Sequence, residues 1–301
     1  DIGVTGVQTC ALPICLALKR DGTVVGWGWN EAGQASPPAG LNGVVAIAAG
    51  TFHSLALKID GTVVAWGDDF YEPLSAPAGL SAVVAIAAGT YHALALKNDG
   101  TVVGWGRNSF GESAAPAELS GVFTIAAGNS YSLALKSDGT VVAWGNNADG
   151  RATPPAGLSG VVAISAGGTH ALALKRDGTV VGWGSNDFGE TTVPAGLSGV
   201  LAIAAGGGHS LALVATLPAL VSQVQALSPP LSRGEANSII QKLWNAQASL
   251  NRGQTNAACG QLGAASNQIE ALVQSGRLTA AQASPLLSAV AAVRAPLACN
   301  N

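Results

Sequence analysis

Residues 44–82 read VVAIAAGTFHSLALKIDGTVVAWGDDFYEPLSAPAGLSA, and this unit recurs along most of the chain. It contains three short apolar runs, VVAIAAG, SLALK and TVVAWG, and the pair Asp60-Gly61 separates the second run from the third. Asp-Gly between β-branched runs is a hairpin signal, because both residues tolerate the positive φ that tight hairpin turns need. The unit is therefore predicted to be a three-stranded antiparallel meander, with a short fourth strand near PAGL as a further option.

The unit repeats at a constant spacing of 39 residues. Asp-Gly pairs begin at Asp21, Asp60, Asp99, Asp138 and Asp177, and Trp-Gly pairs begin at Trp27, Trp66, Trp105, Trp144 and Trp183. Five periods without drift indicate a repeat architecture. Because the runs are apolar on both faces, each unit needs cover on both sides. Copies stacked face to face around an axis provide that cover, so the repeat predicts a mostly β protein with a β-propeller.

The repeats have the form AAGxxHSLALKxDGTVVxWGxNxxGQ, which resembles the regulator of chromosome condensation repeat. Their short period is similar to the bacterial subset that includes β-lactamase inhibitory protein II. The resemblance covers residues 15–214 and implies a seven-bladed, non-catalytic propeller that binds proteins through loops at one end. Five periods and a partial copy at 200–214 amount to about five and a half blades, so we expect an open arc with upstream blades missing, or a smaller ring.

Because antiparallel strands reverse direction at each turn, two sets of loops are predicted to lie at the same end of every blade, which we call the top face. One set follows the run VVAIAAG and the other follows Trp-Gly. The top-face set comprises the aromatic and cationic residues Trp29, Phe52, Phe70, Tyr71, Tyr91, Arg107, Phe110 and Phe188. Aromatic residues and arginine are enriched at binding hot spots, so this set is predicted to bind another protein. The alternative is that the aromatic rings fold over the blade ends as local caps.

The composition argues against two classes of partner. The chain carries 14 basic and 17 acidic side chains, and only 10% of its residues are charged. Phosphate binding needs a dense stripe of Lys and Arg, so no nucleic-acid partner is expected. No run of about 18 apolar residues is unbroken, so no membrane span is expected either. We expect the complete protein to be a monomer.

The histidines and tryptophans of the repeat are predicted to be structural. His53, His92, His170 and His209 occupy one repeat position, with Tyr131 in the remaining copy. Zinc needs three or four ligands around one point, whereas equivalent positions lie one blade apart. The histidines are therefore expected to form hydrogen bonds inside the blades, and the repeat tryptophans to pack between blades. Because no catalytic motif occurs, we expect no enzyme activity, cofactor or metal site.

The N-terminal residues 4–14 read VTGVQTCALPI, which resembles the conceptual translation of a widely used DNA-sequencing adapter. Such segments are excluded from fold reasoning, so residues 1–14 are predicted to lie outside the fold and the propeller to span residues 15–214. The true N-terminus, including any export signal, is then expected to be missing.

Residues 215–301 lack the repeat and carry apolar residues at helical spacing, which predicts a small α-helical bundle. Ser232-x-x-Glu235 and Thr279-x-x-Gln282 read as capping boxes that open helices. Two antiparallel helices joined by a short turn would bring Cys259 beside Cys299. A disulfide there would close a loop of about 40 residues and stabilise by roughly 4 kcal/mol, with two free thiols as the alternative. It would indicate an oxidising, extracytoplasmic location.

These features predict a non-catalytic, extracellular or cell-surface bacterial protein that binds another protein through its propeller. One form of this function is an inhibitor or ligand of a cell-wall or β-lactamase-type enzyme. Two alternatives remain open: guanine-nucleotide exchange on a small GTPase, as in the eukaryotic namesake of the repeat, and a carbohydrate-active propeller whose aromatic residues stack on sugars.

Overall fold

The computed structural model describes residues 4–7, 14–68, 75–195, 197, 199–214, 217–227, 231–252, 254–294, 297 and 299, the first four by their backbone only. The chain divides into two compact units. The first consists of Asp1–Arg176, Val180–Val193 and Ile203–Leu211, and the second of Asp177–Thr179, Pro194–Ala202 and Ala212–Asn301.

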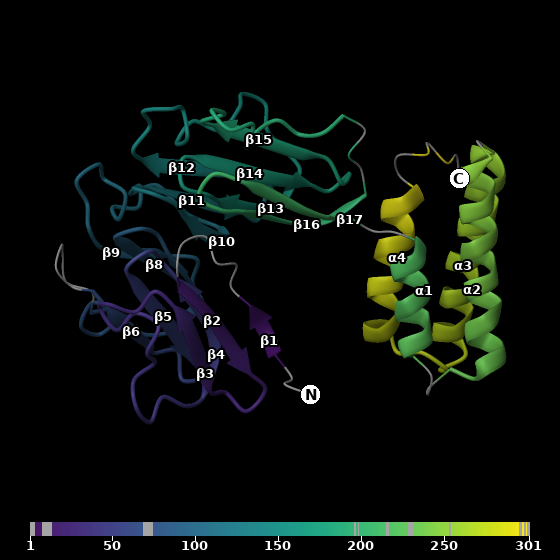
Figure 1. The fold of residues 1–301 in the computed structure, drawn as a ribbon, viewed down its shortest axis with the longest axis horizontal. Helices are drawn as coiled ribbons and strands as arrows, with labels where there is room; N and C mark the ends of the chain where they lie inside the picture. The colour runs from purple at the N-terminus through teal and green to yellow at the C-terminus, as the bar shows by residue number, and fades with distance from the viewer. Residues whose placement is uncertain are drawn as a thin grey trace. The chain divides into compact units, whose positions relative to one another are not determined.

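The repeats form small antiparallel sheets, which we call blades 1 to 6 in chain order (Figure 1). Their strands are β1 Val4–Val7, β2 Ile14–Lys19 and β3 Val24–Gly28; β4 Val44–Ala49, β5 His53–Lys58 and β6 Val63–Gly67; β7 Val83–Ala88, β8 His92–Lys97 and β9 Val102–Gly106; β10 Val122–Ala127, β11 Tyr131–Lys136 and β12 Val141–Gly145; β13 Val161–Ala166, β14 His170–Lys175 and β15 Val180–Gly184; β16 Val200–Ala205 and β17 Ser210–Val214. The mostly β architecture of repeated meanders is confirmed.

The predicted hairpins are present, with one difference at the turn. Lys58 N–H donates to Thr62 O over 2.9 Å, and Thr62 N–H donates to Asp60 Oδ1 over 3.0 Å. Gly61 has φ +78°, whereas Asp60 keeps a negative φ. Asp60 therefore closes the turn with its side chain, and only the glycine uses the left-handed region.

Residues near PAGL form a turn and no fourth strand. In the loop between β3 and β4, Leu41 N–H donates to Pro38 O over 3.1 Å, and Leu80, Leu119 and Leu158 make the same bond in later loops. Proline at the start of this segment has no N–H for a strand ladder. Each described blade therefore keeps at most three strands.

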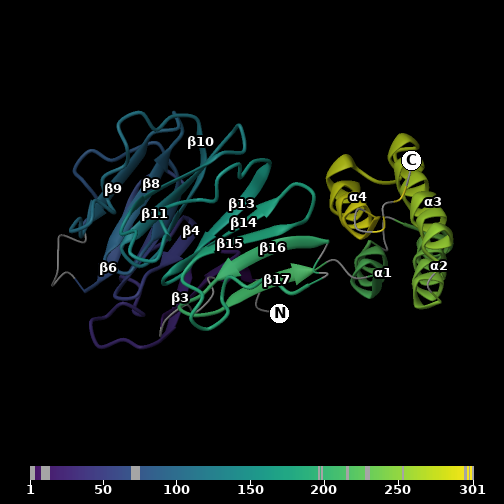
Figure 2. The same ribbon diagram turned by 90° about the horizontal axis from the view of Figure 1, so that it is seen from above.

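Successive blades pack face to face (Figure 2). In blades 2 to 5, the tryptophan of the third strand is buried in one cluster with two leucines of the preceding blade's middle strand: Trp66 with Leu16 and Leu18, Trp105 with Leu55 and Leu57, Trp144 with Leu94 and Leu96, and Trp183 with Leu133 and Leu135. This confirms the interblade role of these tryptophans.

The N-terminal segment differs from the expectation that residues 1–14 lie outside the fold. Strand β1 pairs with β2, with Val4 opposite Lys19 and Val7 opposite Ala17. Ile14 is 1% exposed and belongs to the core of blades 1 and 2. The middle strand of a meander presents unpaired N–H and C=O groups, and an extended apolar segment directly upstream can satisfy them.

The helical part of the second unit contains α1 Leu217–Ala226, α2 Arg233–Asn251, α3 Thr255–Gln274 and α4 Ala280–Arg294. Ile239, Leu243, Leu262 and Ile269 lie at the centre of its core. Both predicted capping boxes form, because Glu235 N–H donates to Ser232 Oγ and Gln282 N–H donates to Thr279 Oγ1. No described helix combines the length and the apolar character needed to cross a bilayer.

The helical bundle is closed by a covalent bond near its C-terminal end. The predicted disulfide between Cys259 and Cys299 is present, with the two Cα atoms 5.5 Å apart. Pro285 lies inside α4, which begins at Ala280.

Candidate functional site

The two loop sets assigned to the top face lie together at one end of each blade. Asp68 N–H donates to Phe52 O, and Arg107 N–H donates to Tyr91 O, both over 2.9 Å. Ser185 N–H makes the equivalent bond to Thr169 O over 3.0 Å. These bonds tie the loop after Trp-Gly to the loop before the middle strand. The positional part of the top-face prediction is thus confirmed where the loops are described.

Four residues of the top-face set form one continuous row, the top-face stack. Trp29 meets Phe52 edge to face, with ring centroids 5.5 Å apart. Phe52 stacks on Tyr91 with centroids 4.8 Å apart and planes 10° from parallel. The guanidinium carbon of Arg107 lies 5.3 Å from the Tyr91 ring centroid. The row crosses the tops of blades 1, 2 and 3.

The repeat explains why these rings meet. Phe52 and Tyr91 occupy one repeat position, so the rotation from blade to blade brings their faces together. Each aromatic pair contributes about 0.5–1.5 kcal/mol beyond the area it buries, and the exposed cation–π contact about 0.5–1 kcal/mol. All four side chains are half-buried. The rings therefore cover one another, as the capping alternative expects, and still present part of their surface to solvent.

Phe110 and Phe188 lie apart from the stack, at equivalent tips of the loops after β9 and β15. Their side chains are 52% and 84% exposed. Each loop is anchored below its tip, because Phe110 N–H donates to Glu112 Oε2 over 2.7 Å and Phe188 N–H donates to Glu190 Oε2 over 2.8 Å. The structure therefore holds both rings out from the blade.

Glu112 and Glu190 are residues that the sequence reasoning missed. Both are buried, and Gln34 takes the same place in the loop after β3, where its Oε1 accepts from Ala32 N–H. The signal was the motif Asn-x-x-Gly-Gln/Glu, which recurs every second repeat at Gln34, Glu112 and Glu190. Two further members of the predicted set, Phe70 and Tyr71, lie outside the described residues.

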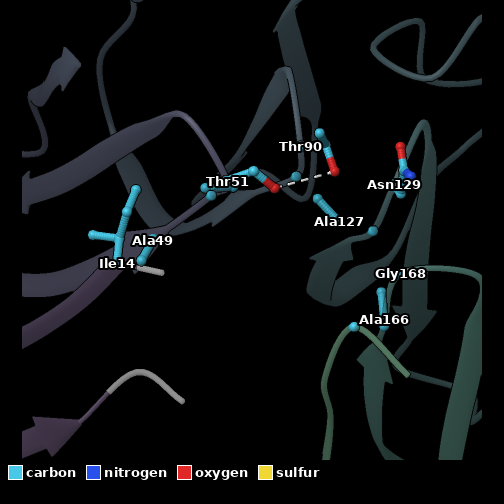
Figure 3. A pocket seen from close by; sticks show the side chains of 14 residues that line it. Ile14, Ala49, Thr51, Thr90, Ala127, Asn129, Ala166 and Gly168 are labelled. Carbon is cyan, nitrogen blue, oxygen red and sulfur yellow. Dashed lines mark hydrogen bonds between the residues drawn. The ribbon is translucent and has the colours of Figure 1, made fainter. Parts of the chain in front are cut away.

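A pocket opens where the first strands of the blades converge (Figure 3). Its lining includes Ala49, Thr51, Ala88, Thr90 and Asn129. The Thr51 hydroxyl donates to Thr90 Oγ1 over 3.4 Å, and Asn129 N–H donates to Gly168 O over 3.3 Å. The lining residues carry no titratable side chain. The pocket offers only hydroxyl, amide and backbone groups, which do not assemble acid–base or nucleophilic chemistry.

Two repeat histidines, His92 and His170, make hydrogen bonds to the next blade, whereas the sequence predicted hydrogen bonds inside the blades. Ser132 Oγ donates to Glu112 O over 2.7 Å, so it can only accept from His92 Nε2, which lies 2.9 Å away. His170 Nε2 and Ser210 Oγ form the same contact at 2.9 Å. Burial lowers the pKa of His53 to about 4 and that of His92 to about 3. These rings are therefore neutral at pH 7, and no metal-binding cluster occurs among the described residues.

The repeats match a known family. Residues 44–72, 83–112, 124–151 and 161–190 match the regulator of chromosome condensation (RCC1) repeat. No curated protein sequence matches the chain at a significant level.

Solved propeller structures are similar to this chain. The crystal structure of Kap60 bound to yeast RCC1 (Prp20) has a TM-score of 0.57 and 20% identity, over 66% of this chain and 64% of that chain. Prp20p from Saccharomyces cerevisiae also has a TM-score of 0.57 and 20% identity, over 70% of this chain and 76% of that one. The CRINKLY WD40 ectodomain of the Arabidopsis thaliana receptor kinase ACR4 has a TM-score of 0.55 and 24% identity, over 68% and 73%.

The chain thus spans less than two thirds of the Prp20 chain in the Kap60 complex. At these identities the similarity concerns the fold. Together with the four matched repeats, it shows that this chain contains RCC1 repeats and has a fold similar to that of RCC1 propellers.

Proposed function

We propose that the chain is a non-catalytic binding protein that holds another protein on its top face. The observation that carries the proposal is the continuous row of Trp29, Phe52, Tyr91 and Arg107, held in place before any partner arrives. Rigid aromatic side chains lose little conformational entropy on binding, so a prearranged row favours affinity.

The exposed rings extend this surface. Phe110 and Phe188 stand on loops whose tips are fixed by buried glutamates, and their rings have little contact with the blades. Large exposed apolar side chains beside half-buried aromatic anchors are typical of binding hot spots and their surroundings. A partner that buries Phe110 and Phe188 while contacting the stack would use all six described residues of the top-face set.

Two further facts support the proposal: the first favours a protein partner, and the second favours a location outside the cytoplasm. One similar fold, Prp20, was crystallised with Kap60 bound, and another study of it concerns binding to Gsp1p and histones. The Cys259–Cys299 disulfide favours an oxidising compartment, and we therefore place the protein outside the cell or at the cell surface of a bacterium. Within that setting, we propose a cell-wall or β-lactamase-type enzyme as the partner.

Surface plasmon resonance tests this proposal with a class A β-lactamase and a penicillin-binding transpeptidase domain as immobilised probes. The double variant Phe52→Ala/Tyr91→Ala should bind at least about tenfold more weakly than the wild type, a loss of about 1.4 kcal/mol. The matched control is Ile59→Ala, because Ile59 is 81% exposed in the hairpin turn at the opposite end of blade 2. Equal affinity of wild type and double variant would exclude the top face, and no binding to either probe would exclude these enzymes.

Guanine-nucleotide exchange is the second candidate, favoured by the similarity to the Prp20 fold. It is tested by release of a fluorescent GDP analogue from a small GTPase in the presence of the chain. Accelerated release would favour exchange over simple binding. A glycan array tests the carbohydrate alternative, and binding there with turnover would favour a carbohydrate-active propeller.

A further inference from the structure

The loop between β3 and β4 contains the only Asn-Gly pair of the sequence, Asn42-Gly43. The side chain of Asn42 is exposed, and its Nδ2 donates one hydrogen bond, to Gly40 O over 3.0 Å. The later loops carry serine at the same repeat position, and these serines are exposed as well: Ser81, Ser120 and Ser159. Exposure of this position is therefore a property of the repeat and does not depend on which blades precede it.

The backbone nitrogen of Gly43 is accessible. Its N–H makes no hydrogen bond with any described residue. A Cβ added to Gly43 would meet only Ile59 Cγ2, at 3.7 Å, so the space around this residue is open. Glycine also has no Cβ of its own to shield its amide nitrogen. A base from solvent can therefore remove the proton of this amide, and the neighbouring side-chain amide of Asn42 can approach the nitrogen.

The Asp-Gly pairs of the hairpin turns differ from Asn42-Gly43 in both respects. Their glycine N–H groups are occupied, because Gly61 N–H donates to Lys58 O over 2.9 Å and the equivalent bonds recur at Gly22, Gly100 and Gly139. Hydrogen bonds from the Thr62 hydroxyl and N–H hold the pKa of Asp60 below its ordinary value. An ionised carboxylate resists attack by a nucleophile, whereas the side-chain amide of Asn42 is neutral.

We propose that Asn42 is a site of spontaneous deamidation. The deprotonated nitrogen of Gly43 attacks Asn42 Cγ, a bond forms between these two atoms, and the Cγ–Nδ2 bond breaks. Nδ2 takes a proton from water and leaves as ammonia, and a cyclic succinimide remains. Water then opens the ring at either carbonyl, which gives aspartate or isoaspartate without any oxidant or reductant. Asparagine is a thermolabile residue, and here the fold leaves it unprotected.

Isoaspartate at this position would loosen the link between the hairpin turns of blades 1 and 2. Gly43 O accepts from Ile59 N–H over 2.9 Å in the turn of blade 2, and Val44 N–H donates to Gly22 O over 3.3 Å in the turn of blade 1. Isoaspartate lengthens the backbone by a methylene directly before Gly43, so both hydrogen bonds lose their geometry. The top-face stack lies at the other end of the blades, and the inference is therefore independent of the proposed function.

Ageing of the purified full chain at mildly alkaline pH tests the proposal. Tandem mass spectrometry should find the replacement of an amide by a carboxyl group at Asn42, and faster conversion at alkaline than at mildly acidic pH, because the attack needs the deprotonated nitrogen. A recombinant protein-isoaspartate methyltransferase with S-adenosylmethionine should methylate the same residue. Asn147 is the internal reference that should stay unmodified, because Thr153 Oγ1 accepts from its Nδ2 and its Oδ1 accepts from Ala152 N–H.

Two variants taken from the repeat itself separate this chemistry from the fold. Asn42→Ser reproduces the sequence Ser120-Gly121 of a later loop and should abolish the modification. Gly43→Ala keeps Asn42 but places a Cβ beside the attacking nitrogen, and it should slow the reaction severalfold. The fold accepts alanine at this position, because Ala82 adopts φ +58° at the equivalent place in the next repeat.

Hydrogen exchange measures the structural consequence. The Ile59 amide should exchange faster in the aged wild type and keep its rate in aged Asn42→Ser. The Ser137 amide should be unchanged in both, because its equivalent bond to Gly121 O, at 2.9 Å, follows a serine. An aged wild type with intact Asn42, equal conversion in Gly43→Ala, or isoaspartate at the Asp-Gly pairs with none at Asn42 would overturn the proposal. Unchanged exchange at Ile59 in the modified chain would overturn the proposed loosening.

Discussion

His92 Nε2 lies 2.9 Å from Ser132 Oγ, 40 residues away on the next blade, and this contact links two middle strands through their buried side chains. The equivalent contact is absent one blade earlier, where Ala93 stands in place of the serine and His53 Nε2 has no partner among the described residues. A buried donor without a partner costs roughly 1–3 kcal/mol.

Ala93→Ser should therefore stabilise the stacked blades. The new hydroxyl can accept from His53 Nε2, and we expect a gain of about 0.5–1.5 kcal/mol in the free energy of unfolding, measured by urea denaturation. Ala171→Ser is the matched control, because Ala171 is equally buried and faces Tyr131 in place of a histidine. Equal changes in the two variants would contradict the role assigned to His53.

The free energy of unfolding of the stacked blades should fall as the pH drops below about 6.5. Burial lowers the pKa of His53 to about 4 and that of His92 to about 3, so the unfolded chain binds protons that the folded chain does not. Each histidine then costs roughly 1.4 kcal/mol per pH unit between about 6.5 and its folded pKa, and its full contribution is present above 6.5.

Urea denaturation at pH 7.5, 6 and 5 measures this dependence. His92→Gln should be less stable at pH 7.5 and should show a shallower dependence on pH. Ile59→Gln serves as the control, because Ile59 is 81% exposed and the substitution changes no titratable group. A wild type with the same stability at pH 7.5 and 5 would contradict the burial of neutral histidines.

Phe52→Ala should weaken the top-face stack from its middle. The variant loses the contacts with both Trp29 and Tyr91, which together contribute about 1–3 kcal/mol, and the near-ultraviolet circular dichroism of the rings should decrease. Phe188→Ala should leave stability unchanged because Phe188 is 84% exposed, and it should reduce only partner binding. Similar destabilisation by the two variants would mean that Phe188 packs on the blade in solution.

Removing the disulfide should destabilise the helical bundle. Cys259 and Cys299 are 40 residues apart, and on the chain-entropy model the bond stabilises by roughly 4 kcal/mol. The double variant Cys259→Ser/Cys299→Ser should lower the urea midpoint of the helical signal at 222 nm, while the near-ultraviolet signal of the blade aromatics keeps its midpoint. An unchanged helical midpoint would show that the bond adds nothing to the packed core.

The amino-acid sequence predicts the position of much of the site. The parity of three short strands puts the loops of Phe52 and Arg107 at one end of the blades, and this holds because antiparallel strands reverse direction at every turn. The buried acceptors Glu112 and Glu190 could not be found in this way, because a charged residue in a polar loop is usually solvated. Their role depends on how each loop folds back under its own tip.

The amino-acid sequence by itself determined the repeat, the strands and hairpin turns of each blade and the capped helices, because these follow from local periodicity and turn chemistry. Tertiary structure alone decided which side chains meet across blades. The row of Trp29, Phe52, Tyr91 and Arg107 depends on the packing of neighbouring blades. The reason is physical: side chains 39 or 40 residues apart make contact only after the stacking of sheets fixes their distance and direction.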